Sequence, residues 1–244
     1  MIDSKIPTVR WDGENLYILD QTLLPATVKE IKLNTPEEAY DAIKELKVRG
    51  APAIGVAAAY SLLIKLKEKT NLPSNDFFKF VKDRAEYLNS SRPTAVNLSY
   101  ALNRMVNKIE PMKDSSSLEL YNILENEAKN IYFEDIDICR KIGEYGVELL
   151  KNDCGILTHC NAGRLAVSGI GTALAPMYVA QEKNIKIRVY ADETRPLLQG
   201  ARLTSFELYE FGIDVTLICD NMAAFIMSKG LIDIIITGCD RVAE

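Results

Sequence analysis

Two apolar, strand-like runs of this sequence each end in a side chain that can take part in acid–base chemistry. Residues 155–160 end in Cys160, and residues 232–240 end in Asp240. In an open parallel sheet, ligands bind outside the carboxyl ends of the strands. A thiol and a carboxyl group at that edge can exchange protons with a substrate, so both are candidate catalytic residues. For Cys160 the competing interpretation is a buried cysteine that packs as a small apolar side chain.

Three arginines stand next to proline or glycine where helices are expected to begin: Arg49, Arg92 and Arg195. The helix macrodipole disfavours a cation at this end by about 0.3–1 kcal/mol. A bound anion removes the conflict, because backbone N–H groups and a guanidinium together form a phosphate site. The repeated pattern therefore favours a phosphate-binding role, although each arginine taken alone also fits a chance surface position.

The elements that must position these side chains fall into two parts. Asp12-Gly13 indicates a tight hairpin between residues 9–11 and 16–19. Helices are expected at 35–46, 53–69, 75–88, 92–109 and 118–150, and strands at 155–160, 185–191, 213–218 and 232–238 alternate with helices at about 165–182, 200–211 and 221–229. This alternation predicts right-handed βαβ units. We expect an α/β fold in which residues 1–130 form a mainly helical N-terminal domain with a short β-hairpin and residues 131–244 form a Rossmann-like parallel-sheet domain.

Composition excludes several classes of function. The net charge of −5 with dispersed basic residues argues against a nucleic-acid surface. No run reaches the roughly 20 apolar residues that span a membrane, and the first residues lack the apolar core of a signal peptide, so we expect a cytoplasmic protein. Five cysteines and one histidine show no zinc-ligand spacing. We expect no metal, no cofactor and no disulfide, and strand alternation gives His159 a structural role.

A dinucleotide fingerprint is a weaker interpretation. Gly169-Ile-Gly171 falls inside an expected helix and lacks the third glycine, whereas the fingerprint needs its glycines in the first strand-to-helix turn. The ribose-binding role of Asp192 depends on the same fingerprint, so it is an equally weak interpretation.

Five motifs taken together resemble the methylthioribose-1-phosphate isomerase family, whose superfamily also holds ribose-1,5-bisphosphate isomerase and regulatory subunits of an initiation-factor exchange complex. They are Arg49-Gly-Ala-Pro-Ala-Ile-Gly55, Arg92-Pro-Thr-Ala-Val-Asn-Leu98, Thr158-His-Cys-Asn-Ala-Gly163, Asp192-Glu-Thr-Arg-Pro-Leu-Leu-Gln-Gly-Ala-Arg202 and Thr237-Gly-Cys-Asp-Arg241. The resemblance implies a cofactor-independent aldose–ketose isomerase of methionine salvage that converts 5-methylthioribose 1-phosphate, a small sugar phosphate, into 5-methylthioribulose 1-phosphate, and we expect a homodimer. It also implies catalysis by Cys160 and Asp240, with substrate contacts from Arg49, Gly50, Ala51, Arg92 and Gln199.

Two further interpretations of the superfamily stay open: a non-catalytic regulatory subunit, and a ribose-1,5-bisphosphate isomerase. Retention of Cys160, Asp240 and the phosphate-binding set together favours an enzyme. In the family, Asn-Gly-Asp and Asn-Lys segments follow the motif that contains Asp240, and we expect this chain to lack them. On that basis we expect the Rossmann-like domain to be truncated and residues 1–244 alone to show negligible isomerase activity.

Overall fold

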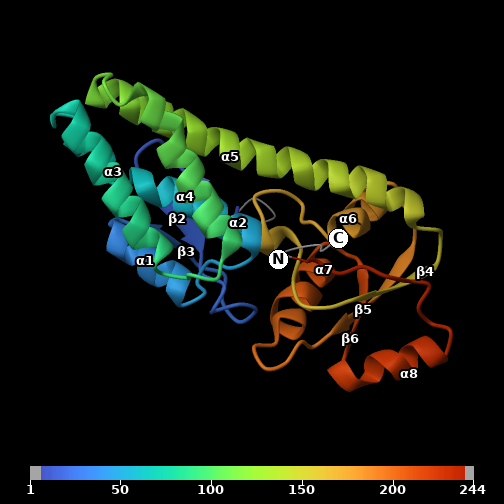
Figure 1. Cartoon of the computed structure of the whole chain (residues 1–244). Helices are drawn as coiled ribbons and strands as arrows, with labels where there is room; N and C mark the ends of the chain where they lie inside the picture. Colours follow the sequence, from blue (N-terminus) through green and yellow to red (C-terminus); the bar gives the residue numbers. More distant parts are fainter. Residues whose placement is uncertain (1–6, 240–244) are drawn as a thin grey trace. The chain divides into compact units, whose positions relative to one another are not determined.

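The computed structural model describes residues 7–239, and Figure 1 shows them coloured along the chain. The chain divides into two compact units: residues 7–22 with 29–134, and residues 23–28 with 135 onward. The division falls inside one long helix, α5 (Ser117–Gly146). No helix of the described part of the chain has the length and apolar character needed to cross a membrane.

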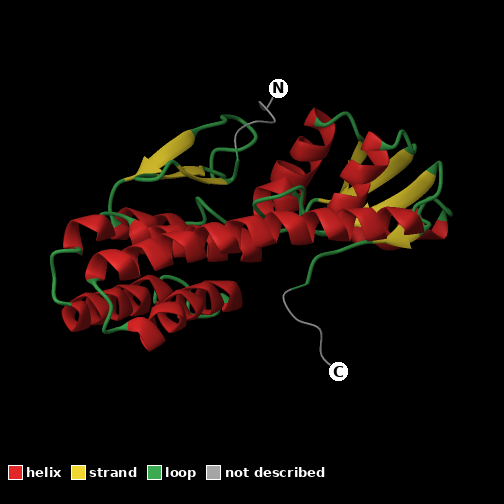
Figure 2. Cartoon of the chain, turned by 90° about the horizontal axis from the view of Figure 1, so that it is seen from above, coloured by secondary structure: helices red, strands yellow, loops and turns green. Residues whose placement is uncertain are grey.

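The first unit combines a small antiparallel sheet with a helical layer, and Figure 2 shows its strands in yellow. The hairpin β1 (Val9–Trp11) to β2 (Leu16–Leu19) turns at Asp12, whose Oδ1 accepts the N–H groups of Glu14 and Asn15. A third strand, β3 (Glu30–Leu33), pairs with β2. The helices are α1 (Pro36–Lys44), α2 (Ala51–Leu63), α3 (Ser74–Asn89) and α4 (Val96–Ile109), with 3-10 turns at Leu66–Lys69 and Glu110–Met112.

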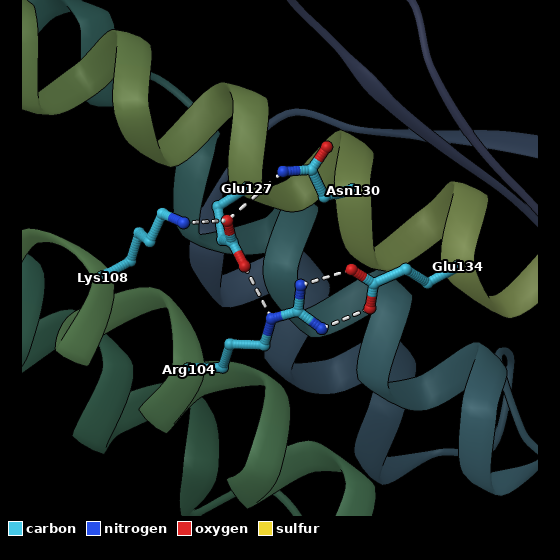
Figure 3. Close-up of polar contacts among 5 residues, drawn as sticks. All are labelled: Arg104, Lys108, Glu127, Asn130 and Glu134. Carbon is cyan, nitrogen blue, oxygen red and sulfur yellow. Dashed lines mark hydrogen bonds and ion pairs between the residues drawn. The ribbon is translucent and has the colours of Figure 1, made fainter.

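The core of this unit forms around α2, because that helix is apolar on all sides and buries every residue from Ala53 to Leu63. Trp11 covers one side of it, stacked on Tyr60 with ring centroids 5.6 Å apart. In the same unit, α4 and α5 are joined by an ion-pair cluster of Arg104, Lys108, Glu127 and Glu134 (Figure 3). The first unit is thus a packed helical layer with charged contacts along one helix pair.

The second unit is built on a four-stranded sheet in the order β6-β5-β4-β7, in which every pairing is parallel. One of the two inner strands, β4, is buried along its whole length, as is typical of a strand inside a parallel sheet covered by helices. The strands are β4 (Cys154–Thr158), β5 (Ile187–Asp192), β6 (Asp214–Ile218) and β7 (Ile234–Ile235). The helices are α6 (Ala175–Glu182), α7 (Ser205–Glu210) and α8 (Ala223–Ser228), with a π-helix at Gly200–Thr204 and 3-10 turns at Val147–Leu149, Arg164–Ala166 and Asp220–Met222.

The expected α/β class, with a small antiparallel sheet, a helical region and a parallel sheet, is confirmed. The expected helix at 165–182 is wrong over its first half, since only Ala175–Glu182 is α-helical. Gly171 adopts a φ of 107° there and packs against Gly163, so an added Cβ would lie 2.8 Å from the Gly163 Cα. Gly169 and Gly171 therefore lie in a loop after β4 rather than in a helix.

Candidate active site at the carboxyl edge of the parallel sheet

Cys160 lies two residues beyond the end of β4, in the left-handed region of backbone conformation with a φ of 61°. This conformation costs a residue with a side chain roughly 1–2 kcal/mol, so surrounding contacts must hold it in place. Its N–H donates to Thr194 Oγ1 at 2.8 Å, and its carbonyl accepts a hydrogen bond from Thr204 Oγ1 at 2.6 Å. The Cys160 side chain is half-buried at this edge.

Thr194 connects the ends of the three strands. Its φ is 61°, its N–H donates to Asp220 Oδ1 at 2.7 Å, and the next N–H, that of Arg195, donates to Asp220 Oδ2 at 2.8 Å. The pKa of Asp220 is lowered chiefly because these N–H groups stabilise the carboxylate. Non-glycine residues with positive φ gather at active sites, and here Cys160, Thr194 and Leu198 share one sheet edge.

His159 follows β4 directly and pairs with Asp192 at the end of β5, with 2.9 Å between Nδ1 and Oδ2. His159, Asp192 and Asp220 place one ligand atom each within 4.8 Å of one another, which makes them the group that could hold a metal ion among the described residues. Both Asp220 oxygens already accept backbone N–H groups, and Asp192 already pairs with the imidazole. This arrangement connects three strand ends through hydrogen bonds.

The segment from Cys160 to Arg164, called here the Cys160 loop, also rests on a carboxylate that sequence reasoning missed. Glu207 of α7 is buried and accepts hydrogen bonds from the Asn161 side chain, the Arg164 N–H and the Tyr178 hydroxyl. Burial raises the pKa of Glu207, while these donors favour the ionised form. A lone glutamate in α7 gives no sequence signal of burial.

The sheet order places Cys160 at the point where the direction of strand addition reverses. From β4 the chain adds β5 and β6 on one side, and β7 pairs with β4 on the other. A crevice outside such a switch point is the usual ligand site of an open parallel sheet. Gly238, three residues beyond β7, packs against the Cys160 loop so closely that an added Cβ would lie 2.9 Å from the Ala162 Cβ. Asp240 lies outside the described residues, so its expected role stays a prediction.

Gln199 belongs to the same unit as Cys160. It is half-buried and immediately precedes the π-helix that carries Thr204. Its neighbour Gly200 lies against the β5 end, where an added Cβ would be 1.7 Å from the Asp192 carbonyl oxygen and 2.9 Å from Thr194 Oγ1. The segment containing Gln199 is therefore close to the residues that hold Cys160.

Arg49, Gly50, Ala51 and Arg92 lie in the first unit. Arg49 and Gly50 precede α2, Ala51 is its first residue, and Arg92 lies four residues before α4. The two helices approach each other near their beginnings, because a Cβ added to Gly55 in the second turn of α2 would lie 3.0 Å from the carbonyl oxygen of Asn97 in the first turn of α4. The structure thus brings the two arginine-containing segments to one end of a helix pair.

These two helix ends differ from that of α1. At α1, Thr35 caps the Glu38 N–H at 3.1 Å and two glutamates occupy the first turn. At α2 and α4 the N-cap residues are Gly50 and Ala95, whose side chains cannot accept a hydrogen bond, and neither first turn contains an acid. Gly50 has a φ of 90°, which favours glycine. Two adjacent helix ends without acidic or capping side chains can bind an anion.

Comparison with known proteins gives a consistent assignment. Residues 47–244 match the family model described as "Initiation factor 2 subunit family". The chain is 54% identical over 242 residues to a 5-deoxyribose 1-phosphate isomerase of Clostridium botulinum (strain Loch Maree / Type A3), covering 98% of this chain and 69% of the relative.

Two solved structures share the fold over nearly the whole chain. The 5-methylthioribose 1-phosphate isomerase from Pyrococcus horikoshii OT3 matches with a TM-score of 0.91 and 39% identity, over 98% of this chain and 67% of that one. The translation initiation factor eIF-2B subunit delta from A. fulgidus matches with a TM-score of 0.86 and 44% identity, over 97% and 69%.

Proposed function

This chain belongs to the Initiation factor 2 subunit family and is an isomerase of that family, and we propose that it converts the 1-phosphate of a five-carbon aldose into the corresponding ketose 1-phosphate. The substrate we favour is 5-deoxyribose 1-phosphate, the sugar named for relatives that are 53–54% identical to this chain. The alternative is 5-methylthioribose 1-phosphate, the sugar named for the solved structure with 39% identity. Both sugars are neutral at C5, which calls for a pocket without cations at that position.

The observation that carries the proposal is the position of Cys160. A thiol in a left-handed backbone conformation, two residues past the strand at which the sheet order reverses, lies where an open parallel sheet binds its ligand. The contact between Gly238 and Ala162 supports a joint role for Cys160 and Asp240, since Gly238 precedes the aspartate by two residues. For the phosphate we propose Arg49 and Arg92 with the uncapped helix ends of α2 and α4.

The chemistry follows from the substrate. A phosphate on C1 holds the sugar ring closed, so the ring oxygen must be protonated before hydrogen can move from C2 to C1. We assign this proton to Asp240 as general acid. Cys160 then has two routes: as a thiolate it removes the C2 proton and returns it to C1, or it stabilises charge while hydride passes directly from C2 to C1. In both routes the C2 hydroxyl loses its proton as the ketone forms, which balances the proton given to the ring oxygen, so the sugar is neither oxidised nor reduced overall. Only in the first route is hydrogen held on the thiol, where it can exchange with solvent before it reaches C1.

The test is turnover of three sugars: 5-deoxyribose 1-phosphate, 5-methylthioribose 1-phosphate and ribose 1,5-bisphosphate. The protein is assayed both as residues 1–244 and extended with family sequence that contains the Asn-Gly-Asp and Asn-Lys segments, which also tests the expectation about the segment after Asp240. Ketose 1-phosphate formed from either of the first two sugars, followed by NMR, supports the proposal. Turnover of the bisphosphate alone would contradict the neutral C5 pocket.

Running the same assay in D2O separates the two routes. Deuterium at C1 of the product indicates proton transfer through the thiolate, and retention of the original hydrogen indicates a hydride shift. A regulatory role of the initiation-factor type, for which the A. fulgidus initiation factor subunit is the relevant relative, predicts no turnover of any sugar in either form of the protein.

A further inference from the structure

We infer that Glu207 is the positioning residue that gives the Cys160 loop its catalytic shape. This assignment deepens the proposed function, because it names a residue that acts on Cys160 from α7 without touching the substrate. The inference starts from the way the loop is held. Five successive residues, from His159 to Gly163, follow the strand in irregular conformation, and polar groups of the irregular backbone must find partners when buried.

Glu207 satisfies the far end of the loop with both carboxylate oxygens. Oε1 accepts from the Asn161 amide, and Oε2 accepts from the Arg164 N–H at 2.7 Å and from the Tyr178 hydroxyl at 2.7 Å. Charge-assisted hydrogen bonds of this kind are about twice as strong as neutral ones. The carboxylate therefore ties the residue after Cys160 to the residue that ends the loop.

Thr204, one helical turn before Glu207, satisfies the near end. Its hydroxyl donates to the Cys160 carbonyl at 2.6 Å and accepts from the Asn161 amide at 3.1 Å. Asn161 thus bridges Thr204 and Glu207, and the three side chains form one buried network. Thr204 and Glu207 stand on one continuous helix, made of the π-helix and α7. The network therefore holds the loop as a rigid element.

The space around Glu207 shows how closely the loop fits the carboxylate. A Cβ added to Gly163 would lie 2.2 Å from Glu207 Oε1 and 2.5 Å from Oε2. Gly163 must therefore lack a side chain for the loop to reach the carboxylate. Since Cys160 has a strained φ of 61°, release of the network allows the loop to leave this conformation.

The experiment compares Glu207→Gln with a matched control, Asp135→Asn. Asp135 is a second carboxylate of the same unit that accepts a backbone N–H, that of Ser168 at 2.6 Å, and burial raises its pKa as well. Ser168, the residue whose N–H Asp135 accepts, lies beyond the end of the Cys160 loop. We expect both variants to lose stability, and only Glu207→Gln to change the behaviour of Cys160.

Two readouts report on Cys160. The first is its alkylation by iodoacetamide in residues 1–244, measured by mass spectrometry relative to exposed Cys219, which needs no enzyme activity. We expect Glu207→Gln to raise this ratio about tenfold. The second readout is kcat, measured in a form of the protein that turns over the sugar. We expect kcat to fall by about tenfold to a hundredfold with KM nearly unchanged, because a displacement of about 1 Å costs on the order of 10²-fold in rate. Asp135→Asn should change neither.

A second pair of variants keeps the test valid if Glu207→Gln does not fold. Thr204→Val should also raise the alkylation ratio and lower kcat. Thr204→Ser, which keeps the hydroxyl, should show the alkylation ratio and kcat of the parent. Equal alkylation ratios in Glu207→Gln and Asp135→Asn, or a Thr204→Val variant that behaves like the parent, would overturn the assignment. If no sugar is turned over at all, the proposed function fails while the alkylation ratio still decides the role of Glu207.

Discussion

Removing Arg104 tests the electrostatics of the first unit most severely, because this guanidinium serves two carboxylates at once (Figure 3). Its Nε lies 2.6 Å from Glu127 Oε1, and its Nη1 lies 2.5 Å from Glu134 Oε2. The Glu127 side chain is only 4% exposed, and Lys108 supplies its other cation at 3.1 Å. We propose Arg104→Met, which keeps the length of the side chain and removes its charge.

The expected loss follows from the burial of Glu127. Leaving one partner of a fully buried ion pair uncompensated costs about 3–5 kcal/mol, whereas an exposed pair contributes about 0–1 kcal/mol. Lys108 remains in the variant and Arg104 is partly open to solvent, so we expect an intermediate loss of about 2 kcal/mol in the free energy of unfolding. The Glu134 pair adds little, because that carboxylate is half-exposed.

Urea unfolding followed by tryptophan fluorescence measures this loss, because the tryptophan lies in the same unit as Arg104. Trp11 is the only tryptophan, and its Nε1 donates to Glu125 of α5 at 3.3 Å. The matched control is Arg140→Met, since Arg140 also pairs with two carboxylates, Glu144 and Glu182, and all three side chains are exposed. Because Arg140 belongs to the second unit, the unfolding of this variant is followed by far-UV circular dichroism, which reports on both units. We expect this control to change stability by less than about 1 kcal/mol.

The difference between the parent and Arg104→Met should depend on pH in a defined direction. Burial alone would raise the pKa of Glu127, but hydrogen bonds from Arg104 and Lys108 outweigh it and lower the pKa, and Arg104 also lowers the pKa of Glu134. A lowered folded-state pKa stabilises the protein above the unfolded value of about 4.3 and ceases to do so as pH falls through the folded value. A loss no larger than that of Arg140→Met, or a full difference that persists at pH 3, would refute this reasoning.

Two further outcomes are expected from the second unit. Burial and the neighbouring Asp135 raise the pKa of Cys139 to about 12, so iodoacetamide at pH 8 should label exposed Cys219 and spare Cys139 in the native protein; equal labelling would contradict the burial. Gly200→Ala should lose about 2 kcal/mol or more, because its Cβ would lie 1.7 Å from a carbonyl oxygen. Gly230→Ala, which has a φ of 68° in open space, should lose about 1 kcal/mol, and equal losses in urea unfolding would contradict the close packing at Gly200.

Elements specified by local chemistry could be predicted from the sequence. Asp12 forms its turn through its own carboxylate, and Thr35 caps α1 directly, so both signals act within a few residues. Arg49 and Arg92 were proposed as phosphate-binding residues for a similar reason, because a cation before a helix start is a local anomaly that a phosphate would explain. The contact between Gly55 and Asn97 then brings their segments together through packing that no local signal contains.

The rest of the site depends on contacts between distant residues. The loop after β4 was mistaken for a helix because its apolar and small residues fit a helical pattern, whereas Gly171 is held against Gly163 in a conformation that ends any helix. Glu207 escaped notice because only the folded chain shows that it is buried beneath the Cys160 loop. No strand was expected at β3, because its four residues form a strand by pairing with β2 and carry no signal of their own.

The most direct test of the central claim is the rate at which the protein, in a form that turns over the sugar, converts 5-deoxyribose 1-phosphate into the ketose 1-phosphate before and after Cys160→Ala. The account predicts turnover by the parent and a fall in kcat of about 10²–10⁴-fold in the variant, the range contributed by a positioned proton-transfer group. The Cys154→Ala variant is the control, because Cys154 is buried at the opposite end of β4. A Cys160→Ala variant that turns over the sugar as fast as the control would contradict the account.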